Sequence, residues 1–238
     1  SGQVCFQIDK PVLNPELNTN MFCGYRKGSW ILFGATMTAG LSLEWWHRII
    51  GEISYDVLNK EVDAIPAGSG GVVFLPYLNG ERTPHVNPNL SGMFIGVNIG
   101  TTRAHMTRAV MEGVAFSLMQ CIEICGSLGF NAKTLVASGG GARSKPWLQL
   151  QADIYNIPLR ISETTEQAGM GAALAAGVGA GVYSNLEEAC RIAVSYKDEL
   201  IIPDPQRHQV YSEYYEFYKK TYLSSKDELQ KAALMGRR

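Results

Sequence analysis

The sequence is short of the features that mark secreted, membrane-spanning or nucleic-acid-binding proteins. Its 238 residues include only five cysteines and four histidines. No apolar run reaches the roughly 18 residues that a membrane span requires. The formal net charge of −1 offers no attraction for nucleic acid or for an anionic membrane surface. We therefore expect neither nucleic acid nor a membrane as a partner.

The cysteines show no paired spacing. Cys121 and Cys125 are four residues apart in a helical pattern, but no histidine is close enough in sequence to complete a zinc motif. We predict free thiols, buried or half-buried, in a reducing compartment, and we expect a cytoplasmic protein with no metal-ligating residues.

The start of the chain is unusual. SGQVCFQID contains no initiator methionine and enters a strand-like run at once. A fragment of a longer protein explains this start, and so does a processed or engineered terminus.

The chain is otherwise rich in alternating strand and helix patterns. Hydrophobic residues make up 46% and charged residues 18%, which is an ordinary globular composition. Strands are expected at 4–9, 30–35, 71–78, 93–98, 134–138 and 157–161, and helices at 36–50, 52–64, 103–128, 144–155 and 168–181. The pattern predicts an α/β layered domain. The Gly/Ala-rich helix at 168–181 should pack very tightly against its neighbours, and the aromatics of 209–223 should dock a C-terminal helix.

Glycine is abundant and clustered, and the cluster in VASGGGARSKPW at 136–147 is the most informative. A strand is followed by Gly139, Gly140 and Gly141 and then by a helix that Ser144 is placed to cap, with Pro146 in its first turn. Bare backbone amides at a helix N-terminus form an anion site. A tight turn is the alternative explanation, and the glycine triplet alone is a weak signal for phosphate because the stretch is neither a P-loop nor GxGxxG.

The segment at 79–92, NGERTPHVNPNLSG, is polar, turn-rich and long for a connection, which is typical of functional loops. With its neighbours it carries a resemblance to the FGGY carbohydrate kinases, the family that includes xylulokinase, gluconokinase and glycerol kinase. The resemblance rests on PYLNGERTPHVNPNLSGMFIGV, on the helix that follows it, on ASGGGARSKPWLQLQADI and on EQAGMGAALAAGVGAG, in the family's order and spacing.

The resemblance implies an RNase H-like, actin-like ATPase domain with a mixed sheet flanked by helices. Residues 1–238 resemble the family's C-terminal nucleotide-binding domain, and the N-terminal sugar-binding domain is absent. The implied activity is ATP-dependent phosphorylation of a sugar hydroxyl, with ATP/ADP and Mg²⁺ bound. GERTPH is most similar to the xylulokinases, whose substrate is D-xylulose and whose product is D-xylulose 5-phosphate. A kinase for gluconate, ribulose or another polyol, and a non-catalytic nucleotide-binding module, remain alternatives.

The resemblance also implies which residues touch the nucleotide. They lie in TAGLSLEW and at the glycine turn: Gly40, Leu43, Glu44, Gly139, Gly140, Gly141, Ser144 and Lys145. A helix-packing glycine is the alternative for Gly40, and a core position is the alternative for Leu43. Where relatives resembling glycerol kinase have Asn at the position of Ser144, this chain has a shorter hydroxyl.

No catalytic residue is assigned to this chain, because the family's catalytic Asp lies upstream of the matched region. Glu81 and Glu112 are expected to be structural or cleft-lining rather than the base. The sugar would be held through the absent domain, and the fragment alone should be inactive. An apolar face where the two domains meet predicts self-association, with a homodimer as the expected partner.

Overall fold

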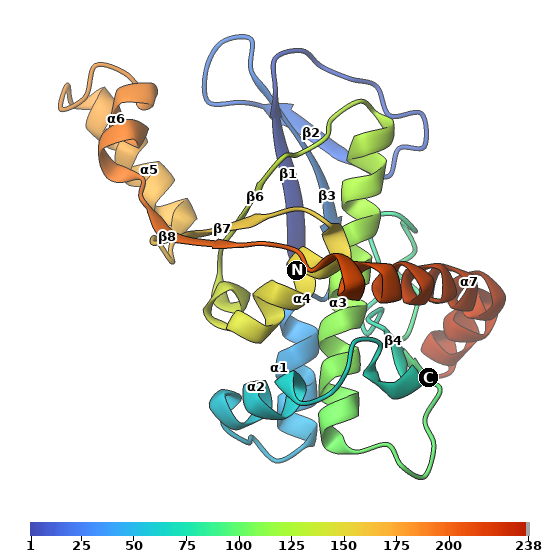
Figure 1. The fold of residues 1–238 in the computed structure, drawn as a ribbon. Coiled ribbons are helices and arrows are strands. Elements are labelled where there is room, and N and C mark those ends of the chain that lie inside the picture. Colours follow the sequence, from blue (N-terminus) through green and yellow to red (C-terminus); the bar gives the residue numbers. More distant parts are fainter. Residues whose placement is uncertain (237–238) are drawn as a thin grey trace.

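The protein is an α/β structure in which three small sheets surround a central helix (Figure 1). The computed structural model describes residues 1–236. The strands are β1 (Gly2–Ile8), β2 (Asn20–Cys23), β3 (Trp30–Thr36), β4 (Val73–Leu75), β5 (Met93–Ile95), β6 (Leu135–Ala137), β7 (Leu159–Ser162) and β8 (Tyr196–Ile201). They pair in the orders β1-β3-β2, β4-β5 and β6-β7-β8. The third sheet is mixed, since β6 is parallel and β8 antiparallel to β7.

The described residues contain seven helices, of which the first five begin and end close to the expected positions and the last is longer than expected. They are α1 (Gly40–Ile49), α2 (Tyr55–Asp63), α3 (Arg103–Ser127), α4 (Lys145–Tyr155), α5 (Gln167–Gly179), α6 (Leu186–Ala193) and α7 (Pro205–Met235), with short 3₁₀ turns at Ser69–Gly71 and Gly140–Arg143. Helix α1 starts later than predicted. The pattern missed β2, α6 and β8.

Helix α3 forms the centre of the core. Its residues are buried over most of its length and contact β1, β3, β4, α1, α2, α4 and α7. Within the described residues it is the one helix long and apolar enough to cross a membrane, but 72% of that window is buried inside the molecule. Its apolar composition is therefore explained by its position in the core.

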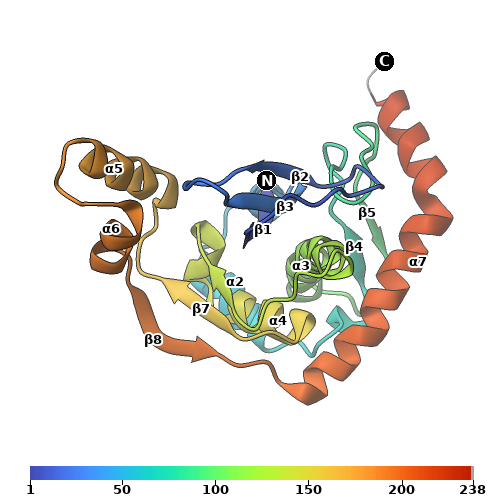
Figure 2. The same cartoon turned by 90° about the horizontal axis from the view of Figure 1, so that it is seen from above.

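Helix α7 docks as its aromatic pattern predicted. Tyr211, Tyr215 and Tyr218 are buried, and the Tyr215 ring stacks on Phe116 of α3 at 5.7 Å between centroids. Figure 2 shows α7 running along the edge of the molecule past α3 and β4. The tyrosines serve packing.

The prediction for the Gly/Ala helix was wrong. In α5 only Leu174 is buried, its main packing partner is α6, and the two helices stand out from the rest of the molecule (Figures 1 and 2). Alanine and glycine permit close approach, but they carry little apolar area whose burial would enforce it.

The cysteine prediction holds in part. All five thiols are free, as expected. Cys121 and Cys125 are buried, whereas the side chains of Cys5, Cys23 and Cys190 are exposed.

A buried ion pair fixes the glycine-rich loop before β4. The Glu112 carboxylate accepts hydrogen bonds from Arg108 Nε at 2.8 Å, Ser69 Oγ at 2.7 Å, Gly68 N at 3.0 Å and Tyr211 Oη at 2.9 Å. Burial raises the pKa of Glu112 against these favourable partners. Ser69 is held in the left-handed region at φ 52°, where a non-glycine residue is rare. Glu112 is structural, as expected.

A second buried carboxylate fixes the long loop after β4. Glu81 is 2% exposed. Its Oε1 accepts from the amides of Met37 and Arg82, each at 2.7 Å, and its Oε2 accepts from Ser117 Oγ at 3.2 Å. The Thr83 amide donates to the Ala35 carbonyl at 2.9 Å. Segment 81–83 is thus bonded to the end of β3, just before α1.

Replacing Glu112 should be strongly destabilising. Glu112→Ala leaves the buried Arg108 guanidinium without its partner, and we expect the free energy of unfolding to fall by about 3–5 kcal/mol. Chemical denaturation measures this. Glu213→Ala removes an exposed glutamate of α7 and should change stability by no more than about 0.5 kcal/mol. Equal effects of the two substitutions would contradict the structural role of Glu112.

The environment of Glu81 predicts a pH-dependent stability. Burial raises its pKa to about 7 from an ordinary value of 4.5, so the folded state binds this proton more tightly than the unfolded state does. The contribution is complete below about pH 4.5 and is lost as the pH rises through 7, a change of about 3 kcal/mol.

Glu81→Gln isolates this effect, because Gln keeps a carbonyl acceptor and cannot ionise. Denaturation of both proteins between pH 4.5 and 8 should show the wild type losing stability relative to the variant as the pH rises. A constant difference across that range would show that Glu81 does not titrate there.

Candidate functional site

The glycine turn joins β6 to α4 through a short 3₁₀ turn. The Ala142 amide donates to the Gly139 carbonyl and the Ser144 amide to the Gly141 carbonyl, both at 3.2 Å. In residues 1–236, the amides of the three glycines themselves have no hydrogen-bond partner. Gly139 and Gly140 are exposed and Gly141 is half-buried. The turn therefore presents free donors next to the N-terminus of α4, as an anion site requires.

The three glycines are bare for different reasons. Gly139 has φ 78°, which favours glycine. A Cβ on Gly141 would lie 3.3 Å from the Trp147 ring. Gly140 has an ordinary φ, and a Cβ there would meet nothing within 4 Å. Neither backbone conformation nor packing within the described chain requires glycine at Gly140.

Ser144 caps α4 as predicted. Its Oγ accepts from the Trp147 amide at 3.3 Å, and Pro146 lies in the first turn. The same hydroxyl donates to Asn59 Oδ1 of α2 at 2.7 Å. Sequence reasoning missed Asn59, because nothing in the helical pattern of 52–64 distinguishes it from other polar positions.

Helix α1 begins at Gly40, the other predicted contact segment. No side chain caps its N-terminus, and Gly40 is exposed with no atom within 4 Å of a Cβ placed there. This excludes helix packing as the reason for the glycine. Leu43 is 6% exposed and belongs to the hydrophobic core, which matches the alternative interpretation of that residue. Glu44 is exposed.

The end of β3, just before α1, contains a buried polar atom without a partner in the described chain. Thr36 is 1% exposed, and its Oγ1 has no hydrogen-bond partner in the described chain. Gly2 and Thr36 face each other across the β1–β3 pair, and a Cβ on Gly2 would lie 2.7 Å from the Ala39 Cβ. The residues between β3 and α1 are therefore closely packed, and the buried Thr36 hydroxyl among them has no hydrogen-bond partner in the described chain.

The charge near the glycine turn is only partly neutralised. Lys145 Nζ lies 2.9 Å from Glu199 Oε2 of β8, and both side chains are largely exposed. Arg143 is exposed and forms no ion pair with any described residue. Together with the amide donors, these two side chains make the surface of the turn suited to an anion.

Helix α2 connects the two segments. Helices α1, α2 and α4 lie on the same side of α3 in Figure 1, and each contacts it. His47 of α1 bonds the Ile53 carbonyl through Nε2 at 2.7 Å and stacks on Tyr55 at 4.5 Å, which braces the α1–α2 turn. Asn59 then bonds Ser144. The C-terminal end of α1 and the glycine turn thus both contact α2 or the residues just before it.

Both segments offer space and hydrogen-bond donors that suit an anionic group. Open space replaces a side chain at both Gly40 and Gly140, and free amide donors face outward at the turn. In the described part of the chain, no group of three or more His, Cys, Asp or Glu residues could hold a metal ion. A cation at this surface would therefore depend on the phosphates for most of its ligands.

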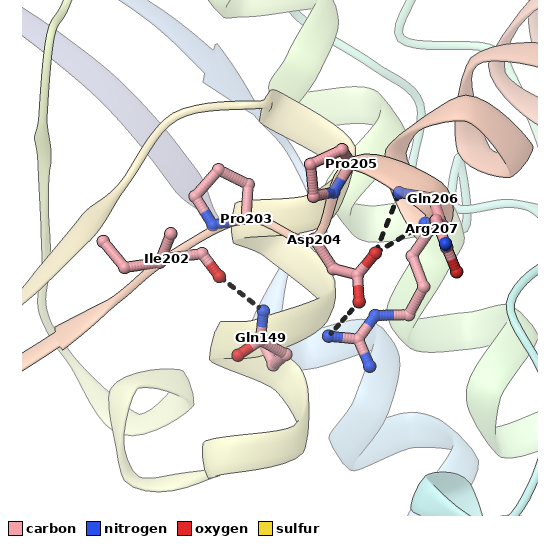
Figure 3. Close-up of a pocket in the computed structure, with 7 residues that line it drawn as sticks. All are labelled: Gln149, Ile202, Pro203, Asp204, Pro205, Gln206 and Arg207. Atoms are coloured by element: carbon pink, nitrogen blue, oxygen red, sulfur yellow. Dashed lines mark hydrogen bonds and ion pairs between the residues drawn. The ribbon is translucent and has the colours of Figure 1, made fainter.

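An open depression of about 630 Å³ lies at the junction of β8 and α7 (Figure 3), and none of the three glycines lines it. Its polar groups are engaged internally. Asp204 caps α7 by accepting from the amides of Gln206 at 2.8 Å and Arg207 at 3.1 Å, and Gln149 Nε2 donates to the Ile202 carbonyl at 2.9 Å. The depression is a structural junction.

Comparisons with known proteins identify the family. Residues 5–180 match the model of the C-terminal domain of the FGGY family of carbohydrate kinases. A xylulose kinase of Bacillus subtilis is 38% identical over 203 residues, which are 85% of this chain and 40% of that protein. One from Staphylococcus epidermidis is 35% identical over 228 residues, 95% of this chain and 46% of that protein.

Solved structures confirm the fold. Ligand-bound xylulose kinase from Lactobacillus acidophilus superposes with a TM-score of 0.87 at 23% identity, over 96% of this chain and 46% of that one. The predicted actin-like α/β fold of the sugar kinases is therefore correct. The chain spans less than half the length of the curated relatives that it matches. By its sequence and its fold, this chain belongs to the FGGY family of carbohydrate kinases and matches their C-terminal domain.

Proposed function

We propose that this chain is the nucleotide-binding part of an ATP-dependent carbohydrate kinase, and that the sugar is D-xylulose. The family match supports phosphoryl transfer to a sugar. The similarity of the GERTPH segment to xylulose kinases, and the named relatives that are xylulose kinases, support the choice of sugar.

The observation that carries the nucleotide part is Gly140. It is exposed, has an ordinary φ and has open space where a Cβ would be, so a ligand that must approach the backbone explains its lack of a side chain. The free amides of the turn would donate to a phosphate or to the ribose, and the uncapped N-terminus of α1 would add further donors at Gly40.

The residues of this chain would act by positioning and by electrostatics. Phosphoryl transfer depends mainly on holding the phosphates and stabilising the charge that spreads over them. Backbone amides fixed by α2 and α4 provide donors that need not reorganise during the reaction. Mg²⁺ carried by the nucleotide would supply additional charge neutralisation at the same place.

Neither buried carboxylate is assigned as the base. Glu81 and Glu112 direct their oxygens at internal donors, and both are about 2% exposed. A base must reach the proton of the sugar hydroxyl, which these groups do not. We propose that the base and most of the sugar site belong to the other half of a full-length kinase, since the relatives are more than twice as long as the region they share with this chain.

Substitution of Gly140 tests nucleotide binding directly. Gly140→Ala should fold normally, with stability raised by about 0.4–1 kcal/mol, because the added methyl meets no atom and restricts the unfolded chain. It should nevertheless weaken Mg-ADP binding, and Gly140→Val should weaken it at least tenfold, about 1.4 kcal/mol. Isothermal titration calorimetry and thermal melting measure the two effects.

Gly179→Ala is the matched control, since a Cβ there also meets nothing within 4 Å and the residue lies at the end of the outlying helix α5. It should leave Mg-ADP affinity unchanged. Wild-type affinity in Gly140→Val would contradict the assignment of the glycine turn, and an absence of binding by the wild type would contradict the proposed function.

The substrate proposal is tested by phosphotransfer. The 238-residue chain alone should not phosphorylate D-xylulose, whereas a polypeptide that also carries the sugar-binding half should release ADP in a xylulose-dependent coupled assay. D-ribulose, gluconate and glycerol serve as competing substrates. Preference for one of these would correct the sugar, and activity with none of them would contradict the kinase assignment.

A further inference from the structure

Asn59 is an oriented amide at the edge of the glycine turn. It lies on α2, is half-buried, and its Oδ1 accepts a 2.7 Å hydrogen bond from Ser144 Oγ. Helices α2 and α4 pack against each other, so the bond joins two fixed elements. The plane of the carboxamide is therefore held in place.

The Ser144 hydroxyl is fully committed as a donor. Its proton goes to Asn59, and its oxygen accepts the Trp147 amide at 3.3 Å. Because its only hydroxyl proton is already in the bond to Asn59, Ser144 cannot also donate to a ligand at the turn. The Asn59 carboxamide, bonded to Ser144, is a neutral side-chain donor beside the turn.

The NH₂ group of the Asn59 side chain is available to bind a ligand. Within residues 1–236, its Nδ2 group has no hydrogen-bond partner. A carboxamide carries two N–H donors, and its carbonyl has two lone pairs, of which Ser144 uses one. Asn59 can therefore donate and accept side by side.

We propose that Asn59 recognises the adenine base of the nucleotide, an inference that rests on the proposed function. An asparagine carboxamide pairs with adenine in two bonds, donating to a ring nitrogen and accepting from the exocyclic amino group. Guanine presents acceptors at both N7 and O6, so Oδ1 would face an oxygen. The pairing selects adenine over guanine.

The charges around the turn favour this division of roles. The glycine amides, Arg143 and the N-terminus of α4 are donors or positive and suit the phosphates. Asn59 is neutral and offers both a donor and an acceptor, which suits a base edge. Lys145, the nearest basic residue on α4, is directed to Glu199.

Asn59→Asp tests the proposal with little structural change. Aspartate keeps an oxygen to accept from Ser144 and replaces the NH₂ donor by a second oxygen. Titrations of Mg-ADP, Mg-GDP and Mg-pyrophosphate are compared for the wild type and the variant. Because ADP and GDP carry the same diphosphate, the ratio of their affinities cancels any general effect of the added charge.

We expect the wild type to prefer ADP and the variant to lose that preference by about tenfold or more, with an unchanged melting temperature. Asn131→Asp is the matched control. Asn131 is exposed and follows the C-terminal end of α3, whereas the Arg103–Glu61 ion pair places α2 beside the N-terminal end. The control should keep the wild-type ratio.

The remaining outcomes overturn the inference in distinct ways. An unchanged ADP-to-GDP ratio in Asn59→Asp shows that Asn59 does not recognise the base. An equal loss for ADP, GDP and pyrophosphate with a lower melting temperature shows that Asn59 only supports the cap of α4. A wild type that binds no nucleotide overturns the proposed function and base recognition together.

Discussion

The burial of α3 is the constraint on which the structure depends. A helix that is apolar around nearly its whole circumference must be enclosed, and β1, β3, β4, α1, α2, α4 and α7 all contact it. These contacts place α1 and α4 against the same central helix although about a hundred residues separate them in sequence. The surface at the glycine turn follows from a packing requirement in the core.

Polar contacts then fix the loops that packing leaves undefined. Glu112 holds the left-handed loop before β4, and Glu81 holds the loop after it against the end of β3. Glu112 accepts the amide of Gly68, which would otherwise be buried without a partner at a cost of about 1–3 kcal/mol. The approach to α1 is rigid because Glu81 accepts the Met37 amide at that point.

Periodicity and turn chemistry predicted most of the core elements and the cap at Ser144, because those features are local. They missed β8, where the charged residues of YKDELI hide the alternation on an exposed strand, and they overestimated the packing of α5. Asn59 was also beyond reach, since its partner Ser144 is 85 positions away and only the tertiary fold brings the two together. The sequence motif pointed to all three glycines. Only the structure shows that Gly140, unlike Gly139 and Gly141, has neither a positive φ nor a close neighbour that requires glycine.

The outlying helices α5 and α6 should be less stable against local unfolding than the core around α3. The pair is held mainly by mutual packing, and Arg26 reaches Glu187 of α6 only through a half-exposed ion pair at 3.4 Å, which contributes little. Glycines in α5 lower its helix propensity further. Backbone amides of α5 and α6 therefore exchange with solvent through local opening, while those of α3 exchange only through global unfolding.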